Sequence, residues 1–148
     1  MKIDNNGLGF LSEGEGLKLK AYKDSGGVWT IGRGVIRYLD GTKVKQGDAI
    51  TAEQEALLFA NTLTKYDVAV DKLVTAKINQ TQHNALVSLC YNIGVDAFSK
   101  STLLKMLNVN PNSLHIREQF MRWVKDNGVV VQGLVNRRKK EADLYFKK

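Results

Sequence analysis

Two carboxylic acids and a threonine stand close together near the start of this 148-residue chain, at Glu15, Asp24 and Thr30. Asp24 follows Glu15 by 9 residues and Thr30 follows it by 15. Hydrolysis of a glycosidic bond needs two carboxyl groups in unlike environments, one that holds a proton and one that stays ionised. A threonine hydroxyl both donates and accepts hydrogen bonds, so it can hold a water beside a carboxylate. These residue types therefore indicate acid/base hydrolysis of a polysaccharide.

A short helix and a small sheet are expected to position these three residues. In the predicted helix over residues 6–14, Leu8 and Leu11 share a face that Glu15 would prolong. From about residue 17 to residue 46, short apolar runs alternate with turn residues, including Gly26-Gly27 and Asp40-Gly41. We expect a three-stranded antiparallel sheet there.

The rest of the chain has helical periodicity. Thr51 and Gln54 form a capping-box pattern at the start of a long amphipathic helix. Its expected inward residues are Ala52, Ala56, Phe59, Leu63, Tyr66, Val70 and Leu73. A second helix is predicted from about Asn79 to Gly94, and others over residues 100–108, 114–124 and 135–146. The predicted fold is a single α+β domain over residues 1–148, in which a sheet lobe (residues 15–50) packs beside a larger helical lobe across a cleft.

Motifs along nearly the whole chain resemble one family of enzymes. The N-terminal motif consists of Glu15-Gly16, Ala21-Tyr22-x-Asp24, Gly27 and Thr30-Ile31-Gly32-x-Gly34. Two later motifs are Tyr91-Asn92-Ile93-Gly94 with Phe98 and Ser101-Thr102, and Gly133-Leu134-x-Asn136-Arg137-Arg138-x-x-Glu141. Together they resemble the phage-type lysozymes, glycoside hydrolase family 24. The resemblance implies a lysozyme-like fold and no cofactor or metal.

The resemblance also implies an activity and roles for the three residues. The expected reaction is hydrolysis of the β-1,4 bond between N-acetylmuramic acid and N-acetylglucosamine in peptidoglycan. Glu15 would be the general acid, with a pKa raised by burial. Asp24 and Thr30 would position the attacking water, which favours inversion at the anomeric carbon. A retaining reaction would need the two carboxyls about 5–5.5 Å apart rather than about 6.5–9.5 Å.

Supporting residues are expected on the same grounds. Ile36, Tyr91, Asn92 and Ser101 match the family's substrate groove. Core packing is the alternative role for Tyr91, and helix capping is the alternative for Ser101. Arg137 resembles an arginine that pairs with the catalytic glutamate. The alternative for Arg137 is membership of a solvated basic run, Arg137-Arg138-Lys139-Lys140.

Two positions depart from the family pattern. Val35 stands where many members have a histidine, so the structural salt bridge of that histidine is absent. Arg33 occupies a position that is often apolar or aromatic. Details of the sheet lobe are therefore expected to differ from those of other members.

The remaining residues with metal-binding or nucleophilic side chains have ordinary explanations. His83 and His115 lack the neighbouring cysteines or histidines of a zinc site, so each is expected on the surface or partly buried in a helix. Cys90, the single cysteine, cannot form an intramolecular disulfide and is expected to pack as a small apolar side chain.

The charge of +7 predicts attraction to polyanions but does not choose among cell wall, anionic membrane and nucleic acid. A basic binding module is therefore one alternative function, although no nucleic-acid motif accompanies the charge and no nucleic-acid partner is expected. A lytic transglycosylase is another, disfavoured because both Asp24 and Thr30 are present.

The chain shows neither a signal peptide nor a transmembrane stretch. We expect a monomer that stays in the host cytoplasm until a separate holin releases it to the peptidoglycan.

Overall fold

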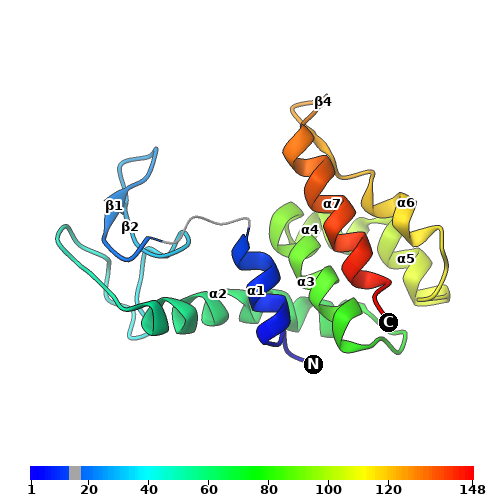
Figure 1. Cartoon of the computed structure of the whole chain (residues 1–148), viewed down its shortest axis with the longest axis horizontal. Coiled ribbons are helices and arrows are strands. Elements are labelled where there is room, and N and C mark those ends of the chain that lie inside the picture. Colours follow the sequence, from blue (N-terminus) through cyan, green and yellow to red (C-terminus); the bar gives the residue numbers. More distant parts are fainter. Residues whose placement is uncertain (14–17) are drawn as a thin grey trace. The chain divides into compact units, whose positions relative to one another are not determined.

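The computed structural model describes residues 1–13 and 18–148, which form two compact units. Leu8–Thr64 form the sheet unit, and Met1–Gly7 join Lys65–Lys148 in the helical unit. Glu15 lies outside the described residues. The division of the chain into a part with strands and a larger helical part agrees with the predicted α+β fold class (Figure 1).

The sheet unit contains one short antiparallel pair. Strand β1 (Tyr22–Lys23) pairs with β2 (Trp29–Thr30), so that Tyr22 faces Thr30. Within the described residues the third strand of the expected sheet does not form, and an isolated bridge between Ile31 and Val35 follows β2 instead. Gly32 and Gly34 have φ angles of +62° and +79°, and these left-handed conformations turn the chain back on itself directly after Thr30.

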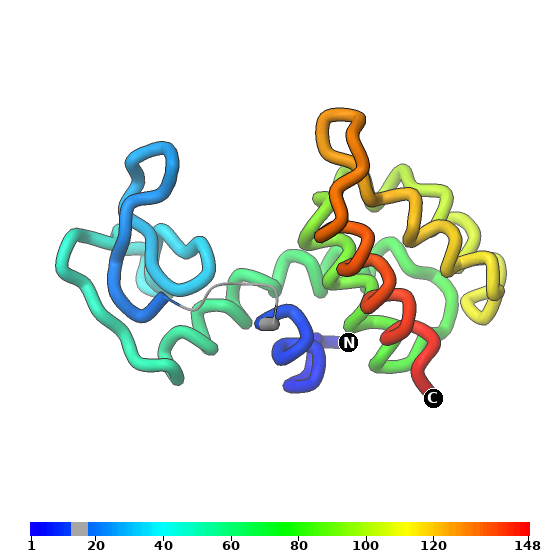
Figure 2. The backbone as a smooth tube through the Cα atoms, turned by 45° about the horizontal axis from the view of Figure 1, so that its top comes forward, coloured from blue at the N-terminus to red at the C-terminus, as the bar shows by residue number. Residues whose placement is uncertain are grey.

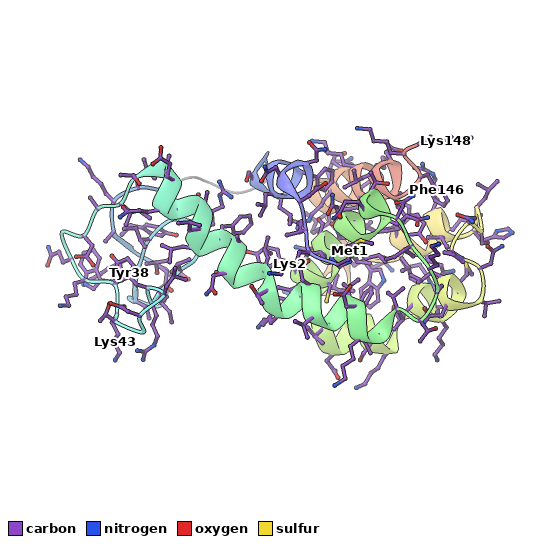
Figure 3. All side chains as sticks on the ribbon, turned by 90° about the horizontal axis from the view of Figure 1, so that it is seen from below. Met1, Lys2, Tyr38, Lys43, Phe146 and Lys148 are labelled. Carbon is purple, nitrogen blue, oxygen red and sulfur yellow. The ribbon has the colours of Figure 1, made fainter. Side chains whose placement is uncertain are left out.

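The later loop of the sheet unit turns at Asp40-Gly41, as predicted. Asp40 Oδ1 accepts hydrogen bonds from the backbone and hydroxyl of Thr42, and a bridge joins Arg37 to Lys43. Tyr38, in the same loop, donates its hydroxyl to Asp48 at 2.7 Å (Figure 3 labels Tyr38 and Lys43). The apolar core of this unit consists of Ile31, Val35, Val44 and Leu58. Val35, where the resemblance would place a histidine, is thus a core residue.

Helix α2 (Ala52–Leu73) has residues in both units. Its predicted capping box is present, since Gln54 N donates to Thr51 Oγ1 and Thr51 N donates to Gln54 Oε1. The prediction of its buried face was wrong over the first turns, where Ala52 and Ala56 are exposed and Glu55 is buried. Glu55 faces inward because it pairs with Arg33.

The helical unit is built around α3 (Gln80–Ile93), which packs along α7 (Gln132–Tyr145) (Figures 1 and 2). Asn79 caps α3 and Gly94 ends it, as predicted. The other helices of the described chain are α1 (Asn5–Glu13), α4 (Val95–Lys100), α5 (Thr102–Val109) and α6 (Ile116–Phe120). Helix α1 begins in this unit and continues into the sheet unit.

Helix α4 and a hairpin of the helical unit were not predicted. Helix α6 ends at Phe120 rather than near residue 124, and a hairpin of β3 (Lys125–Asp126) and β4 (Val129–Val130) precedes α7. Asn127 and Gly128 form its two-residue turn with φ angles of +50° and +78°. Figure 2 shows this hairpin between the α6 segment and α7. Asn-Gly is the residue pair that this kind of hairpin turn favours.

The two histidines and the cysteine differ in burial. His83 is fully buried, which contradicts the expected surface or partly buried position, because its Nε2 lies 2.8 Å from the carboxylate of Asp67. His115 is exposed. Cys90 packs in the core as predicted. Among residues 1–13 and 18–148, no helix has both the length and the apolar character to cross a membrane.

Candidate active site

Asp24 lies in the exposed turn that follows β1. Its Oδ1 accepts hydrogen bonds from the backbone N–H groups of Gly26 and Val28, both at 2.9 Å. Within the described ranges, Oδ2 has no hydrogen-bond partner. The turn therefore orients the carboxylate through one oxygen and leaves the other available to a water or a substrate hydroxyl.

Thr30 ends β2 and is only 3% exposed. Its Oγ1 donates to the carbonyl oxygen of Val28 at 2.9 Å. The proton of the hydroxyl is thus directed to the backbone, and the oxygen keeps lone pairs with which to accept a hydrogen bond. Burial and this bond restrict the rotation of the side chain.

The backbone of Val28 connects the two candidate residues. Its N–H donates to Asp24 Oδ1, and its carbonyl oxygen accepts from Thr30 Oγ1. The hairpin is closed further by a backbone bond from Asp24 N to Val28 O at 3.0 Å. The backbone of Val28 thus orients both the Asp24 carboxylate and the Thr30 hydroxyl. No sequence motif predicted this role of Val28.

The third candidate, Glu15, lies outside the described residues, so its role as general acid stays a prediction. The choice between inversion and retention stays a prediction for the same reason. The chain resumes in the structure at Lys18, whose carbonyl accepts a hydrogen bond of 2.7 Å from the backbone N–H of Gly32. The turn after Thr30 is therefore bonded to the chain three residues beyond Glu15.

The expected substrate residues lie in different surroundings. In the sheet unit, Ile36 is 48% exposed and lines a pocket of about 330 Å³ with Val28 and Trp29. In the helical unit, Tyr91 packs edge-on against Tyr66, with ring centroids 5.3 Å apart. The tyrosine is half-buried, so this packing is compatible with a residual exposed edge.

Ser101 and Asn92 are close to two pockets of the helical unit. Ser101 is 4% exposed and caps α5, because its Oγ accepts from Leu104 N and donates to Phe98 O. The capping alternative is thus confirmed, and a substrate contact by Ser101 stays a prediction. Asn92 is exposed, and its Oδ1 accepts from Arg138. The pockets that Asn92 and Ser101 line share two residues, Arg122 and Trp123.

Arg137 reaches two residues of its own unit. Its Nε lies 3.3 Å from Glu141 Oε2, and its Nη2 lies 3.4 Å from both Ser88 O and Ser88 Oγ. The expected pairing with Glu15 stays a prediction, since Glu15 is not among the described residues.

Arg138, next to Arg137, is the fully buried arginine of this helix. It pairs with the buried Glu141 and also donates to Asn92 Oδ1 and to the carbonyl of Trp123. Burial lowers the pKa of Arg138 from its usual value, and the charge of Glu141 opposes that shift. Membership of a solvated basic run is therefore wrong for Arg138, although Lys139 and Lys140 are exposed.

The part of the chain that the structure describes contains no cluster of three histidine, cysteine or acidic side chains arranged to hold a metal ion. The chemistry that the described residues can support is hydrogen bonding and proton transfer around an oriented, exposed carboxylate and a buried hydroxyl.

Comparison with known proteins gives one consistent family. The sequence profile of the family described as "Phage lysozyme" matches residues 12–141. The chain is 40% identical over 146 residues to the endolysin of Salmonella phage P22, covering 99% of both chains. Among solved structures, it is similar to an endolysin from Escherichia coli O157:H7 phage FAHEc1 (40% identity, 99% and 94% coverage, TM-score 0.86). A mutant P22 lysozyme is similar at 38% identity, 99% coverage of both chains and a TM-score of 0.89.

Proposed function

Because the chain belongs to the phage lysozyme family, we propose that Glu15, Asp24 and Thr30 carry its catalysis. The chain is a peptidoglycan-hydrolysing endolysin of the muramidase type, which cleaves after N-acetylmuramic acid. The observation that supports the residue roles is the geometry at Val28, whose backbone binds both the Asp24 carboxylate and the Thr30 hydroxyl.

In the proposed reaction, a water bridges the two oriented groups. It donates one hydrogen bond to Asp24 Oδ2 and a second to Thr30 Oγ1, whose own proton is directed to Val28 O. The water oxygen attacks the anomeric carbon of the muramic acid residue while Glu15 protonates the departing oxygen. Asp24 takes up the proton that the water loses. One water is consumed, and the product anomer is inverted.

The substrate residues follow from the same proposal. Ile36 contributes an exposed apolar surface in the sheet unit, while Tyr91, Asn92 and Ser101 contribute from the helical unit. Arg137 supports the general acid. Ser101 also has a structural role, because its hydroxyl caps α5.

The biological setting is also proposed. As an endolysin, the protein acts as a monomer, accumulates in the host cytoplasm and reaches the peptidoglycan when a holin opens the inner membrane. Its charge of +7 supports electrostatic contact with the anionic cell wall or membrane. No cofactor is required for this chemistry, since proton transfer and water attack suffice.

The decisive experiment is mass spectrometry of purified peptidoglycan digested by the wild type and by Glu15→Gln, Asp24→Asn and Thr30→Ala. Reducing N-acetylmuramic acid ends in the wild-type digest that disappear with Glu15→Gln support the proposal. Glu53→Gln, an exposed carboxyl on α2, is the matched control and should digest normally. Anhydro-muramic ends would identify a transglycosylase instead, and absence of cleavage by the wild type would favour the basic binding module.

The stereochemistry is tested separately. Proton NMR of a short oligosaccharide digest, recorded before the new reducing end equilibrates, reports the first anomer formed. The α-anomer supports water attack guided by Asp24 and Thr30. The β-anomer would assign Asp24 a covalent role and contradict the inverting mechanism.

A further inference from the structure

A buried ion pair lies beside the turn that directly follows Thr30. Arg33 Nη2 lies 3.2 Å from Glu55 Oε2, and the two side chains are only 10% and 2% exposed. The Arg33 guanidinium also lies over the ring of Phe59, with Cζ 4.5 Å from the ring centroid. Glu55 and Phe59 are one turn apart on α2, so this helix contacts the Arg33 side chain at two points.

Glu55 also contacts the backbone of this turn. A Cβ on Gly32 would lie 3.0 Å from Glu55 Cγ and 3.5 Å from Glu55 Oε1, so any other residue there would crowd the carboxylate. Gly32 itself donates to the carbonyl of Lys18 at 2.7 Å, and reciprocal backbone bonds between Ile31 and Val35 close the turn. Glu55 therefore packs against the residue that joins the turn to Lys18.

The turn needs an anchor because its own residues give it little rigidity. Gly32 and Gly34 have φ angles of +62° and +79°, and glycine has more backbone freedom than any other residue. Of the three residues 32–34, only Arg33 has a side chain that can be anchored. Thr30 precedes Gly32 by two residues, so a movement of the turn also moves the hydroxyl that is proposed to hold the attacking water.

Stability alone does not account for this pair. Arg33 Nε and Glu55 Oε1 are buried without a hydrogen-bond partner among the described residues, and such atoms cost free energy. Apolar side chains of similar volume often stabilise a fold as well as a buried ion pair does. A charged hydrogen bond adds direction, because it fixes the angle as well as the distance between two groups. The pair is therefore better suited to fixing a geometry than to raising stability.

From these contacts we infer that Arg33 and Glu55 are positioning residues for the hydrolysis, which hold the turn after Thr30 in place from α2. The inference rests on the proposed function, in which the Thr30 hydroxyl guides the attacking water. In this role the pair acts through the backbone of the turn rather than on the substrate. Its removal therefore lowers kcat and leaves KM nearly unchanged.

The test uses a variant that removes both charges together. Arg33→Met/Glu55→Leu replaces the pair by apolar side chains, so no unpaired charge stays buried. The control is Arg117→Met/Asp143→Leu, which removes an exposed ion pair of the helical unit whose Nη1 and Oδ1 atoms are 2.8 Å apart. Both variants and the wild type are assayed for kcat and KM on soluble peptidoglycan fragments, well below the Tm of each protein.

We expect kcat of Arg33→Met/Glu55→Leu to fall by about tenfold while KM changes by less than about twofold, and the control to keep both constants. Arg33→Lys keeps a cation opposite Glu55 but loses the planar guanidinium, so its kcat should lie between those of the wild type and the apolar variant. A wild-type kcat in the apolar variant overturns the inference, and so does a loss that appears only in KM.

A double-mutant cycle with Thr30→Ala shows whether the pair acts through Thr30. In the Thr30→Ala background, the apolar replacement of the pair should lower kcat by less than about twofold, because the hydroxyl that the pair positions is already gone. Equal losses of kcat with and without Thr30 would mean that the pair acts elsewhere and would overturn the inference.

A measurement without substrate separates this inference from the catalytic proposal. Hydrogen exchange followed by ¹⁵N NMR reports the opening of the bond from Gly32 N to the carbonyl of Lys18. In the apolar variant the Gly32 amide should exchange about tenfold faster, while the amides of α3 keep their wild-type rates. If the wild type cleaves nothing, or if Thr30→Ala cleaves normally, the catalytic proposal fails and exchange at Gly32 decides this one. Faster exchange supports a pair that holds the turn, and unchanged exchange refutes it.

Discussion

Replacing Glu55 by glutamine tests whether the sheet unit depends on a buried ion pair. Arg33 Nη2 lies 3.2 Å from Glu55 Oε2, and the two side chains are 10% and 2% exposed. The guanidinium also lies over the ring of Phe59, 4.5 Å from its centroid. Glu55→Gln removes the negative charge and leaves the Arg33 cation in the same surroundings.

The size of the effect follows from burial. Breaking a buried pair by removing one partner costs about 3–5 kcal/mol of the free energy of unfolding. The lower end applies here, because Arg33 keeps some solvent contact and Arg33 Nε and Glu55 Oε1 have no hydrogen-bond partner within the described residues. We expect a loss of about 3 kcal/mol, which for a chain of this length lowers Tm by about 6–12 °C.

The assay is urea unfolding at pH 7, followed by circular dichroism, for Glu55→Gln and for a double-mutant cycle of Arg33→Met, Glu55→Leu and the two together. Arg33→Met/Glu55→Leu replaces both charges by apolar groups and should recover most of the stability lost by either single change. Glu53→Gln, an exposed carboxyl in the same helix, should change stability by less than about 0.5 kcal/mol. A loss below about 1 kcal/mol for Glu55→Gln, or additive losses in the double variant, would refute a coupled buried pair.

The remaining predictions concern three local features. Burial raises the pKa of Cys90 to about 11, and the charge of Lys65 opposes the shift. A thiol reagent at pH 8 should therefore modify Cys90 only after urea is added. Fast labelling of the folded protein would contradict the burial of this thiol. Because the folded-state pKa of this thiol is the higher one, its contribution to stability should be present below about pH 9 and decline as the pH rises toward 11, which urea titrations across that range can measure. Asp4 Oδ1 accepts hydrogen bonds from Gly7 N at the start of α1 and from Asn84. Asp4→Ala should therefore lower the free energy of unfolding in urea by about 1 kcal/mol, while Asp4→Asn should lose only part of that amount. Equal losses in the two variants would argue against capping. The bond from Gly7 lowers the pKa of Asp4, so the difference between wild type and Asp4→Ala should shrink as the pH falls below about 4. Gly128→Val should destabilise by about 1 kcal/mol or more because Gly128 has a φ of +78°, and an unchanged urea midpoint would contradict the assigned turn.

Local features of the fold could be predicted because their signals lie within a few residues of each other. Helix ends are marked by bonds that span three or four residues. Thr51 bonds with Gln54 at the start of α2, Asn79 caps the start of α3, and Gly94 ends α3. The turn that holds Asp24 was likewise indicated by its glycines. The β3–β4 hairpin was missed although Asn127-Gly128 carried a usable signal.

Buried charges were the larger omission, because their partners lie far apart in sequence. Glu55 is inward only because Arg33 meets it, and His83 is buried only because Asp67 accompanies it. The same applies to Arg138, which pairs with Glu141 on its own helix and donates to Asn92, 46 residues away. Hydrophobic periodicity assigns such residues to the surface, and only tertiary contacts reverse that assignment.

In the candidate site, too, some features could be predicted from local sequence signals and others could not. The positions of Asp24 and Thr30 were indicated by residue type and family resemblance, whereas the role of the Val28 backbone was not, since a main-chain group leaves no mark in a sequence. The pocket around Arg122 and Trp123 was also missed, because four separate segments build it.

The discontinuous helical unit imposes an order on folding during synthesis. Its first residues are bonded to partners far downstream: Ile3 N donates to Asp67, Asn84 donates to Asp4, and Gln80 donates to the carbonyl of Lys2, across 64, 80 and 78 residues. A ribosome delivers all of Leu8–Thr64 before it delivers these partners. The sheet unit can therefore collapse before Met1–Gly7 can bond to these partners. The loop-closure entropy for such distances must be lost before the contacts form, so pairing of the N-terminal segment is expected to follow collapse of the sheet unit.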